Sequence, residues 1–351
     1  MYRDALTRWA AGVLAAFAFA LPAPSTAADS TSKEQAQRQA VQPLNNAPVW
    51  RDVRSGEINP YQTTQVRGTE TNVLIQSEGE VWRQIRNGPI TIYGGWLVVA
   101  FLAALAAFYA VKGQIKLHEK PSGRLIERFN AWERIVHWTT AISFIILAIS
   151  GIVMLFGKHI LLPLFGYTLF SWLSILSKNL HNFVGPLFVL CTVLMVFTFI
   201  KDNLPRAYDW LWIRKAGGLF SGEHVPSGRF NAGEKSWFWL GVTALGLVVS
   251  VTGVILDFPQ LVDGARSAMQ QANIIHAIAA VIFVALSLGH IYLGTIGMEG
   301  AYESMRNGYV DETWAKEHHE YWYRDATANR SASGAAPTAA AASPMKEGWK
   351  L

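Results

Sequence analysis

The sequence predicts an all-α integral membrane protein, because its apolar residues are concentrated in long uninterrupted runs. Of its 351 residues, 51% are hydrophobic and only 16% are charged, compared with roughly 25% charged residues in an average soluble domain. Five runs are long enough to cross a bilayer as helices. They lie at about residues 90–111, 135–156, 182–200, 237–256 and 273–296. We expect the last four, within residues 124–300, to form a four-helix bundle. The first, within 89–112, is an additional N-terminal transmembrane helix.

The amino terminus has the pattern of a secretory signal peptide. Arg3 and Arg8 precede an apolar stretch at residues 9–21, and a run of small residues follows at 25–28, the usual order of such a peptide. An uncleaved membrane helix is the alternative, but the apolar stretch is too short to span a bilayer. We expect residues 1–28 to be removed near Ala27 or Ala28. Residues 29–88 are polar and rich in turn-forming residues, which predicts an extended arm outside the cytoplasm.

Basic residues in the connecting loops predict the direction of the spans. The loops after the first and third spans hold six Lys or Arg residues each, whereas those after the second and fourth hold two and one. Short loops rich in Lys and Arg stay in the cytoplasm. The mature amino terminus is then periplasmic, and the tail, residues 301–351, is cytoplasmic and partly disordered. This topology suits the inner membrane of a bacterium.

Charge and cysteine content exclude several classes of protein. The net charge is +5, but the basic residues adjoin the spans, so no nucleic-acid partner is needed to explain them. Cys191 is the only cysteine. The chain therefore has no internal disulfide, no cysteine-ligated iron–sulfur cluster and no attachment motif for c-type haem.

Four histidines stand at the ends of predicted spans, and two of them share the last span. His276 and His290 are fourteen residues apart. On a helix this spacing corresponds to a rise of about 21 Å and returns to within about 40° of the same face. The last span runs inward, so His276 lies at the outer level and His290 at the inner level. His181 begins the third span on the outside and His137 begins the second on the inside. The expected pairs are His181 with His276 and His137 with His290.

Two bis-histidine sites stacked across a membrane predict two b-type haems in a four-helix dihaem cytochrome b bundle. Neutral imidazole binds iron well, and iron with both axial positions filled transfers electrons rather than binding oxygen. Satisfied interface histidines are the simpler interpretation of any single residue. A proton relay normally recruits Asp or Glu within the spans, which this sequence lacks, and a zinc site needs more ligands at one level. A haem-free transporter or anchor is the alternative of a different class.

Glycines in or beside the spans have two interpretations. They either make room for flat porphyrins or allow ordinary close packing of membrane helices. They are Gly151, Gly185, Gly241, Gly253, Gly289 and Gly294. The remaining histidines have no partner at their own depth and are expected to be solvated. They are His118, His159, His224, His318 and His319.

Six segments together resemble the cytochrome b556 (gamma) subunit of membrane-bound formate dehydrogenases. The segments are RIVHWTT, LHNFVG, RFNAGEK, IIHAIAA, GHIY and WAKEHHEYWYR, and the resemblance covers residues 124–325. No single segment is specific, because the cytochromes of nickel–iron hydrogenases and thiosulfate reductases are similar four-helix bundles. The combination is what indicates the family. The signal peptide, arm and first span are additions to its compact members.

The resemblance implies a place in an electron-transfer chain. In this family a molybdenum or tungsten (molybdopterin, alpha) subunit oxidises formate outside the membrane, and an iron–sulfur (beta) subunit passes the electrons on. This chain then does not act on formate itself. The implied ligands are His181 and His276 for the outer haem, and His137 and His290 for the inner haem, from which quinone is reduced. The equivalent subunit of a hydrogenase or another periplasmic oxidoreductase is the nearest alternative.

The resemblance also implies a quinone site at the turn before the fourth span, near the inner haem. This turn is Asn231, Ala232, Gly233, Glu234 and Lys235. An amide can donate to a quinone carbonyl, a glycine admits a close approach and a carboxylate can deliver a proton. On the residues alone, helix capping is the better explanation of an Asn-Ala-Gly-Glu sequence, and only the resemblance favours a quinone site. Family members usually carry Gln at the position of Glu234, which leaves the role of the acid open.

Overall fold

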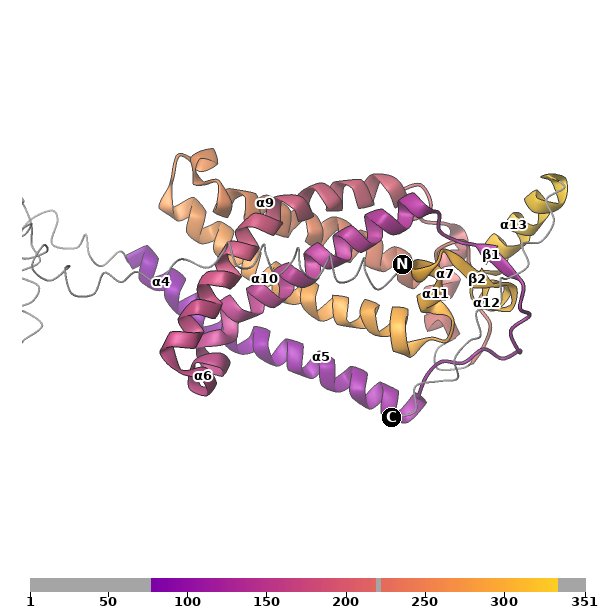
Figure 1. Ribbon diagram of the computed structural model, residues 1–351, viewed down its shortest axis with the longest axis horizontal. Helices are drawn as coiled ribbons and strands as arrows, with labels where there is room; N and C mark the ends of the chain where they lie inside the picture. The colour runs from indigo at the N-terminus through magenta and orange to yellow at the C-terminus, as the bar shows by residue number, and fades with distance from the viewer. Residues whose placement is uncertain (1–76, 219–221, 334–351) are drawn as a thin grey trace, which may run out of the picture. The chain divides into compact units, whose positions relative to one another are not determined.

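The computed structural model describes residues 77–218 and 222–333 (Figure 1). The predicted signal peptide, most of the predicted arm and the last part of the tail lie outside these residues. The fold described below belongs to the unit Glu78–Leu351.

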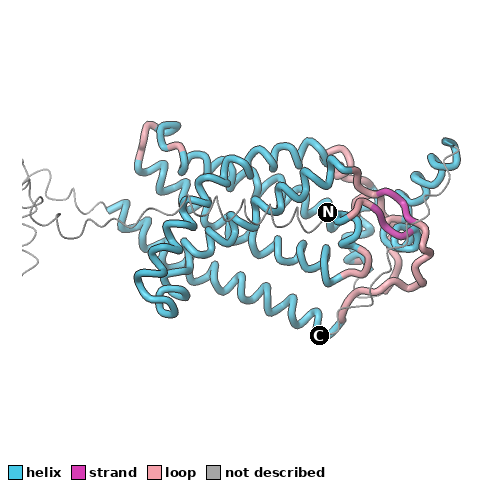
Figure 2. Tube along the Cα trace, in the orientation of Figure 1, coloured by secondary structure: helices cyan, strands magenta, loops and turns pink. Residues whose placement is uncertain are grey.

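Apolar helices dominate the described residues, as the sequence predicts. Four continuous helical runs are long and apolar enough to cross a membrane. They are Gly79–Lys112, Ala131–Phe199, Ala232–Asp257 and Arg266–Gly297. Together they identify an integral membrane protein, and their side-by-side arrangement is seen in Figure 2.

The longest run, α6 (Ala131–Phe199), is a helical hairpin. Its backbone leaves helical geometry at Gly166, where φ is 72° and ψ is 176°, a conformation that residues with a Cβ rarely adopt. The two limbs then lie side by side (Figure 1), and Thr140 Oγ1 on the first donates to Cys191 O on the second over 3.4 Å. The predicted spans 135–156 and 182–200 are therefore the two limbs of one hairpin. The residues predicted to form a loop between them are helical up to the bend.

The third and fourth runs complete the four-helix core. The third consists of α8 (Ala232–Ser236), a π-helix (Trp237–Leu245) and α9 (Gly246–Asp257). A 3-10 turn, Pro259–Val262, leads to α10 (Arg266–Tyr292), which ends in a second π-helix, Leu293–Gly297. Helix α10 contacts both α9 and α5.

The first run packs against α10 through small residues. It comprises α4 (Ser77–Ile85), a π-helix (Arg86–Ile90) and α5 (Thr91–Lys112). A Cβ on Gly94 would lie 3.2 Å from Val281 Cγ1, and one on Gly289 would lie 3.4 Å from Phe101 Cε1. These two glycines therefore allow α5 and α10 to pack closely. Of the two interpretations of Gly289, the structure supports close helix packing.

The end of the predicted extended arm is helical instead, since α4 covers its last residues from Ser77. Glu80 stabilises this turn by accepting hydrogen bonds from the side chains of Arg83 and Gln84. Trp82 Nε1 also donates to Asn273 Oδ1 on α10 over 3.1 Å. These local and long-range contacts explain why a polar segment is ordered here.

The end of the bundle that the sequence predicts to be cytoplasmic carries a small folded lid. Strand β1 (Leu125–Glu127) pairs antiparallel with β2 (Tyr309–Asp311), with Ile126 opposite Val310. We call residues 301–323 the inner lid; it contains α11 (Ala301–Arg306), β2, α12 (Glu312–His318) and the start of α13 (Glu320–Ser333). Its core includes the buried Trp314 and Ala315. Helix α7 (Ala207–Arg214) and a 3-10 turn, Ala216–Gly218, precede α8. Thus residues 301–333 of the predicted tail are folded.

Candidate functional site

The four span-end histidines meet in the two pairs expected from the sequence. His181, on the second limb of α6, lies beside His276 of α10, with ring centroids 6.0 Å apart. His137, at the start of α6, lies beside His290 near the end of α10, with ring centroids 6.3 Å apart. We call them the outer pair and the inner pair, following the predicted topology.

The separation within each pair fits a metal ion between the two rings. Two metal–nitrogen bonds of about 2 Å, added to the radii of two imidazoles, place the ring centroids about 6 Å apart. A direct hydrogen bond of about 3 Å between ring nitrogens would place them nearer 5 Å. The observed values of 6.0 and 6.3 Å are compatible with this arrangement, and they also fall in the range of ordinary edge-to-face or tilted contacts between aromatic rings.

The outer pair is held by hydroxyl groups on neighbouring helices. Ser150 Oγ lies 2.9 Å from His181 Nδ1, and Thr252 Oγ1 lies 3.0 Å from His276 Nδ1. Ligating histidines characteristically use their second ring nitrogen in such a bond. The sequence reasoning did not identify these two residues, although each precedes a glycine that it singled out.

The inner pair has an aromatic environment instead. The indole of Trp237 stacks on His290, with centroids 5.0 Å and planes 14° apart. Trp138 meets His137 edge to face at 5.3 Å. His137 Nδ1 is buried without a hydrogen-bond partner. A buried unpaired nitrogen is costly, so this ring is poorly explained by packing alone.

An aromatic layer lies between the two pairs. Phe283 is seven residues from both His276 and His290, hence on nearly the same face of α10. Its ring centroid is 4.7 Å from that of Phe144 and 6.4 Å from that of Phe188, which come from the two limbs of α6. We call these three phenylalanines the aromatic layer. It fills the centre of the bundle between the two histidine levels.

The predicted quinone residues form a helix cap. Asn231 Oδ1 accepts from Glu234 N over 3.0 Å, and Glu234 Oε2 accepts from Asn231 N over 2.8 Å. A Cβ on Gly233 would lie 2.7 Å from the Trp212 ring, so packing requires this glycine. The capping interpretation is therefore correct for the local structure. The turn nevertheless lies near the inner pair, because Trp237 follows Glu234 by one helical turn.

Sequence reasoning missed a buried cluster beside this turn. Arg128 Nη2 donates to Glu234 Oε1 over 2.9 Å, and its guanidinium lies 4.9 Å from the Trp314 ring centroid. His319, expected to be solvated, is only 1% exposed. Its Nδ1 is 2.8 Å from Gly228 O. Burial, reinforced by the Arg128 charge, lowers the pKa of His319 to about 3. The prediction was wrong because the inner lid, which includes His319, packs this side chain against Ser227 and Gly228.

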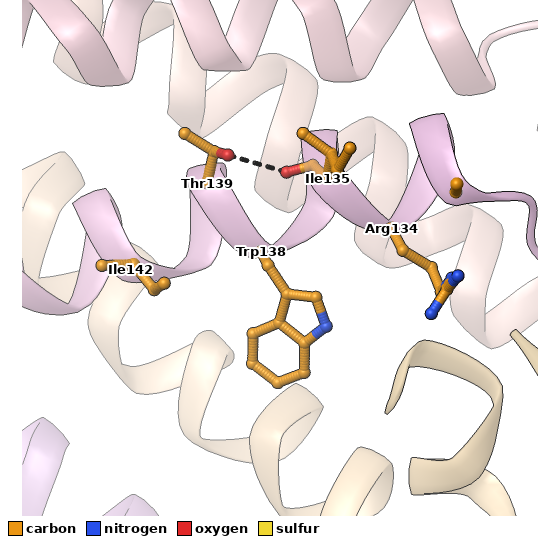
Figure 3. A pocket seen from close by; sticks show the side chains of 6 residues that line it. Arg134, Ile135, Trp138, Thr139 and Ile142 are labelled. Atoms are coloured by element: carbon orange, nitrogen blue, oxygen red, sulfur yellow. Dashed lines mark hydrogen bonds between the residues drawn. The ribbon is translucent and has the colours of Figure 1, made fainter. Parts of the chain in front are cut away.

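A pocket of about 410 Å³ lies on the first limb of α6 (Figure 3). Its lining is mostly apolar, with Trp138 and Arg134 directed to one side of the helix. None of the four paired histidines lines it. The pocket adjoins the inner pair through Trp138, whose ring contacts His137.

Comparison with known proteins identifies the family. Residues 128–308, which include all four paired histidines, match the family described as prokaryotic cytochrome b561. The chain belongs to this family. Membership in the prokaryotic cytochrome b561 family implies a b-type haem.

Similar proteins of this kind are cytochrome subunits of formate dehydrogenases. The cytochrome b556(fdo) subunit of Escherichia coli (strain K12) is 33% identical over 208 residues, covering 57% of this chain and 92% of the relative. The nitrate-inducible cytochrome b556(Fdn) subunit of the same strain is 30% identical over 212 residues, covering 58% and 92%. A Haemophilus influenzae formate dehydrogenase cytochrome b556 subunit is 26% identical over 203 residues, covering 55% and 79%. The resemblance noted in the sequence is confirmed.

Proposed function

We propose that this chain is the membrane-anchored, electron-transferring subunit of a formate dehydrogenase complex and carries two b-type haems. The observation that supports it most directly is the presence of two histidine pairs, at 6.0 and 6.3 Å, at opposite ends of α10. The names of the similar proteins supply the donor, formate. Its partners are an iron–sulfur subunit and a molybdopterin catalytic subunit on the outer side.

The four histidines hold the two haems in this proposal. His181 and His276 would hold the outer haem, and His137 and His290 the inner haem. When bound, each haem supplies reversible one-electron chemistry. Two imidazoles on each group would leave oxygen no open coordination site. Helix α10 sets the distance between the two levels, because His276 and His290 are fourteen positions apart.

Quinone is reduced at the inner pair in this proposal, next to Asn231, Gly233 and Glu234. The support is the closeness of this turn to His290 through Trp237. Glu234 already accepts from Asn231 N and Arg128 Nη2. These bonds hold Glu234 in place as a carboxylate between the inner lid and the proposed quinone position.

Residues 79–112 form an additional membrane span in this proposal, with the amino terminus periplasmic and the inner lid cytoplasmic. The run has the required length and apolarity. Loops rich in Lys and Arg follow it and the α6 hairpin, as expected for cytoplasmic loops. The bundle then lies in the inner membrane.

Purification of the chain with its partner subunits tests this function. The reduced-minus-oxidised spectrum and the extracted haem are expected to give two b-type haems per chain, reducible by formate. A purified chain without haem would instead indicate a transporter or anchor. Reduction by hydrogen and not by formate would assign the chain to a hydrogenase.

A further inference from the structure

The two outer histidines are held in the same way by two different helices. On the first limb of α6, Ser150 is followed by Gly151, and on α9, Thr252 is followed by Gly253. In each case the hydroxyl meets the Nδ1 atom of a histidine on a neighbouring helix, at 2.9 and 3.0 Å. Each histidine thus meets a hydroxyl residue and, next to it, a glycine.

Each of these hydroxyl groups also has a helix carbonyl as an acceptor for its own proton. Ser150 Oγ donates to Ile146 O over 2.8 Å, and Thr252 Oγ1 donates to Val248 O over 2.6 Å. A hydroxyl has a single proton. With that proton directed to a helix carbonyl, the oxygen accepts from the imidazole Nδ1–H. The remaining nitrogen, Nε2, is then unprotonated and presents its lone pair to a metal.

The glycines make room for the imidazole rings. A Cβ on Gly253 would lie 3.3 Å from His276 Cε1, and one on Gly151 would lie 3.5 Å from His181 Cε1. The first of these distances is tighter than ordinary van der Waals contact. The ring edge therefore lies directly over the glycine, and the adjacent hydroxyl determines its rotation.

The inner pair lacks this arrangement. His137 Nδ1 is buried with no partner, and His290 is positioned by the Trp237 ring. Among hydrogen bonds found in the described residues, hydroxyl bonds to paired histidines occur only in the outer pair. The two sites therefore differ in the polarity of the groups that contact their ligands.

We propose that Ser150 and Thr252 are positioning residues that set the tautomer and rotation of the outer ligands and lower the reduction potential of the outer haem. An imidazole that donates its Nδ1–H to an acceptor is a stronger electron donor through Nε2. Stronger donation stabilises the oxidised iron, so the potential falls. The proposal rests on the haem-binding function proposed above.

The test uses the assembled complex with Ser150→Ala, Thr252→Ala and the double variant. Optical redox titration measures the midpoint potential of each haem, and the low-spin EPR signal reports the angle between the ligand planes. We expect the outer midpoint potential to rise in each single variant and further in the double variant. The inner potential should stay unchanged. Ser150→Thr and Thr252→Ser, which keep a hydroxyl, should restore values close to wild type.

Ser143→Ala is the matched control. Ser143 is a buried serine on the same limb of α6, and its hydroxyl donates to Thr140 O without contacting a histidine. This variant should leave both potentials unchanged. A similar shift in Ser143→Ala, or unchanged outer potential and EPR signal in the double alanine variant, would overturn the proposal.

If a variant loses haem, its haem content becomes the measurement that decides the test. Selective loss of the outer haem from the alanine variants, with both haems retained in Ser143→Ala and in the hydroxyl-keeping variants, supports the positioning role. Equal loss from Ser150→Ala and Ser150→Thr contradicts it. Absence of haem from the wild-type complex would refute the proposed function itself, and it is detected before any variant is compared.

Discussion

The indole of Trp237 lies flat against the imidazole of His290, with the two ring planes only 14° apart. Trp237 lies in the π-helical segment that follows α8. The capping residues Asn231 and Glu234 and the ring that stacks on His290 therefore belong to one short helical stretch at the start of the third run.

Replacing Trp237 by alanine should loosen the inner site alone. The stacked ring limits rotation of His290, and its removal leaves a cavity worth about 3–5 kcal/mol in a packed core. We expect a lower content of inner haem in Trp237→Ala, with the outer haem retained, as measured by redox-resolved optical spectra. Trp237→Phe keeps a stacking ring and is the control. Equal loss of both haems in Trp237→Ala would argue against a local role.

Single histidine substitutions should sort into two classes. His181→Ala and His276→Ala should each remove the outer haem, and His137→Ala and His290→Ala the inner haem, because each pair shares one iron. Haem content and the spectra of the four variants provide the measurement. A shared phenotype of His276→Ala and His137→Ala, distinct from the other two, would show that the pairing is wrong.

Quinone reduction should depend on Asn231 beyond its capping role. Asn231→Ala removes both the cap, at about 1 kcal/mol, and the amide, whereas Asn231→Asp keeps a capping oxygen. We expect both to retain two haems and reduction by formate, but to slow reoxidation by quinone severalfold. Stopped-flow spectroscopy of haem oxidation measures this.

A second capping box provides the control. Asn130 Oδ1 accepts from Glu133 N over 3.0 Å, and Glu133 Oε2 accepts from Asn130 N over 2.9 Å at the start of α6. Asn130→Ala therefore loses an equivalent cap and should reoxidise normally. Normal reoxidation in both Asn231 variants would place quinone elsewhere and leave this turn as a cap.

The inner lid should lose stability in acid because of His319. Its pKa is about 3 in the folded protein and about 6.5 when unfolded. Below about pH 6.5 the unfolded chain binds a proton that the folded lid excludes, so stability falls as the pH falls, until about pH 3. The slope is about 1.4 kcal/mol per pH unit from this group.

Hydrogen exchange of residues 301–323 between pH 7 and 5 measures this effect. His319→Gln removes the titrating group and should flatten the pH dependence. His159→Gln is the control, since His159 is exposed and lies on α6, outside the lid. An unchanged slope in His319→Gln would assign the acid sensitivity to other groups.

The sequence predicted the histidine pairs because a regular helix converts spacing into depth and direction. The spacing of fourteen positions from His276 to His290 determines their relative depth and direction without any knowledge of the neighbouring helices. Ser150 and Thr252 were not identified, because their bonds depend on how adjacent helices are rotated against each other. The sequence also did not predict that the second and third spans form one helical hairpin. The helix continues past residue 157 to Gly166, where the non-helical backbone of this one residue reverses the chain.

The burial of His319 was unpredictable for a related reason. It requires pairing of β1 with β2, elements of three residues each that are separated by most of the bundle. Short strands carry almost no periodic signal. The cap at Asn231 and Glu234 was predicted as one of two alternatives, since its four-residue pattern is purely local.

The aromatic layer affects electrons and protons differently. An electron crosses an apolar layer by tunnelling, whereas a proton needs a continuous file of polar groups or waters, and waters enter only where such groups hold them. Phe144, Phe188 and Phe283 offer no such groups at the centre of the bundle. In the proposed function, electrons that pass between the two histidine levels would cross this layer, whose three rings offer a proton no hydrogen-bonding group.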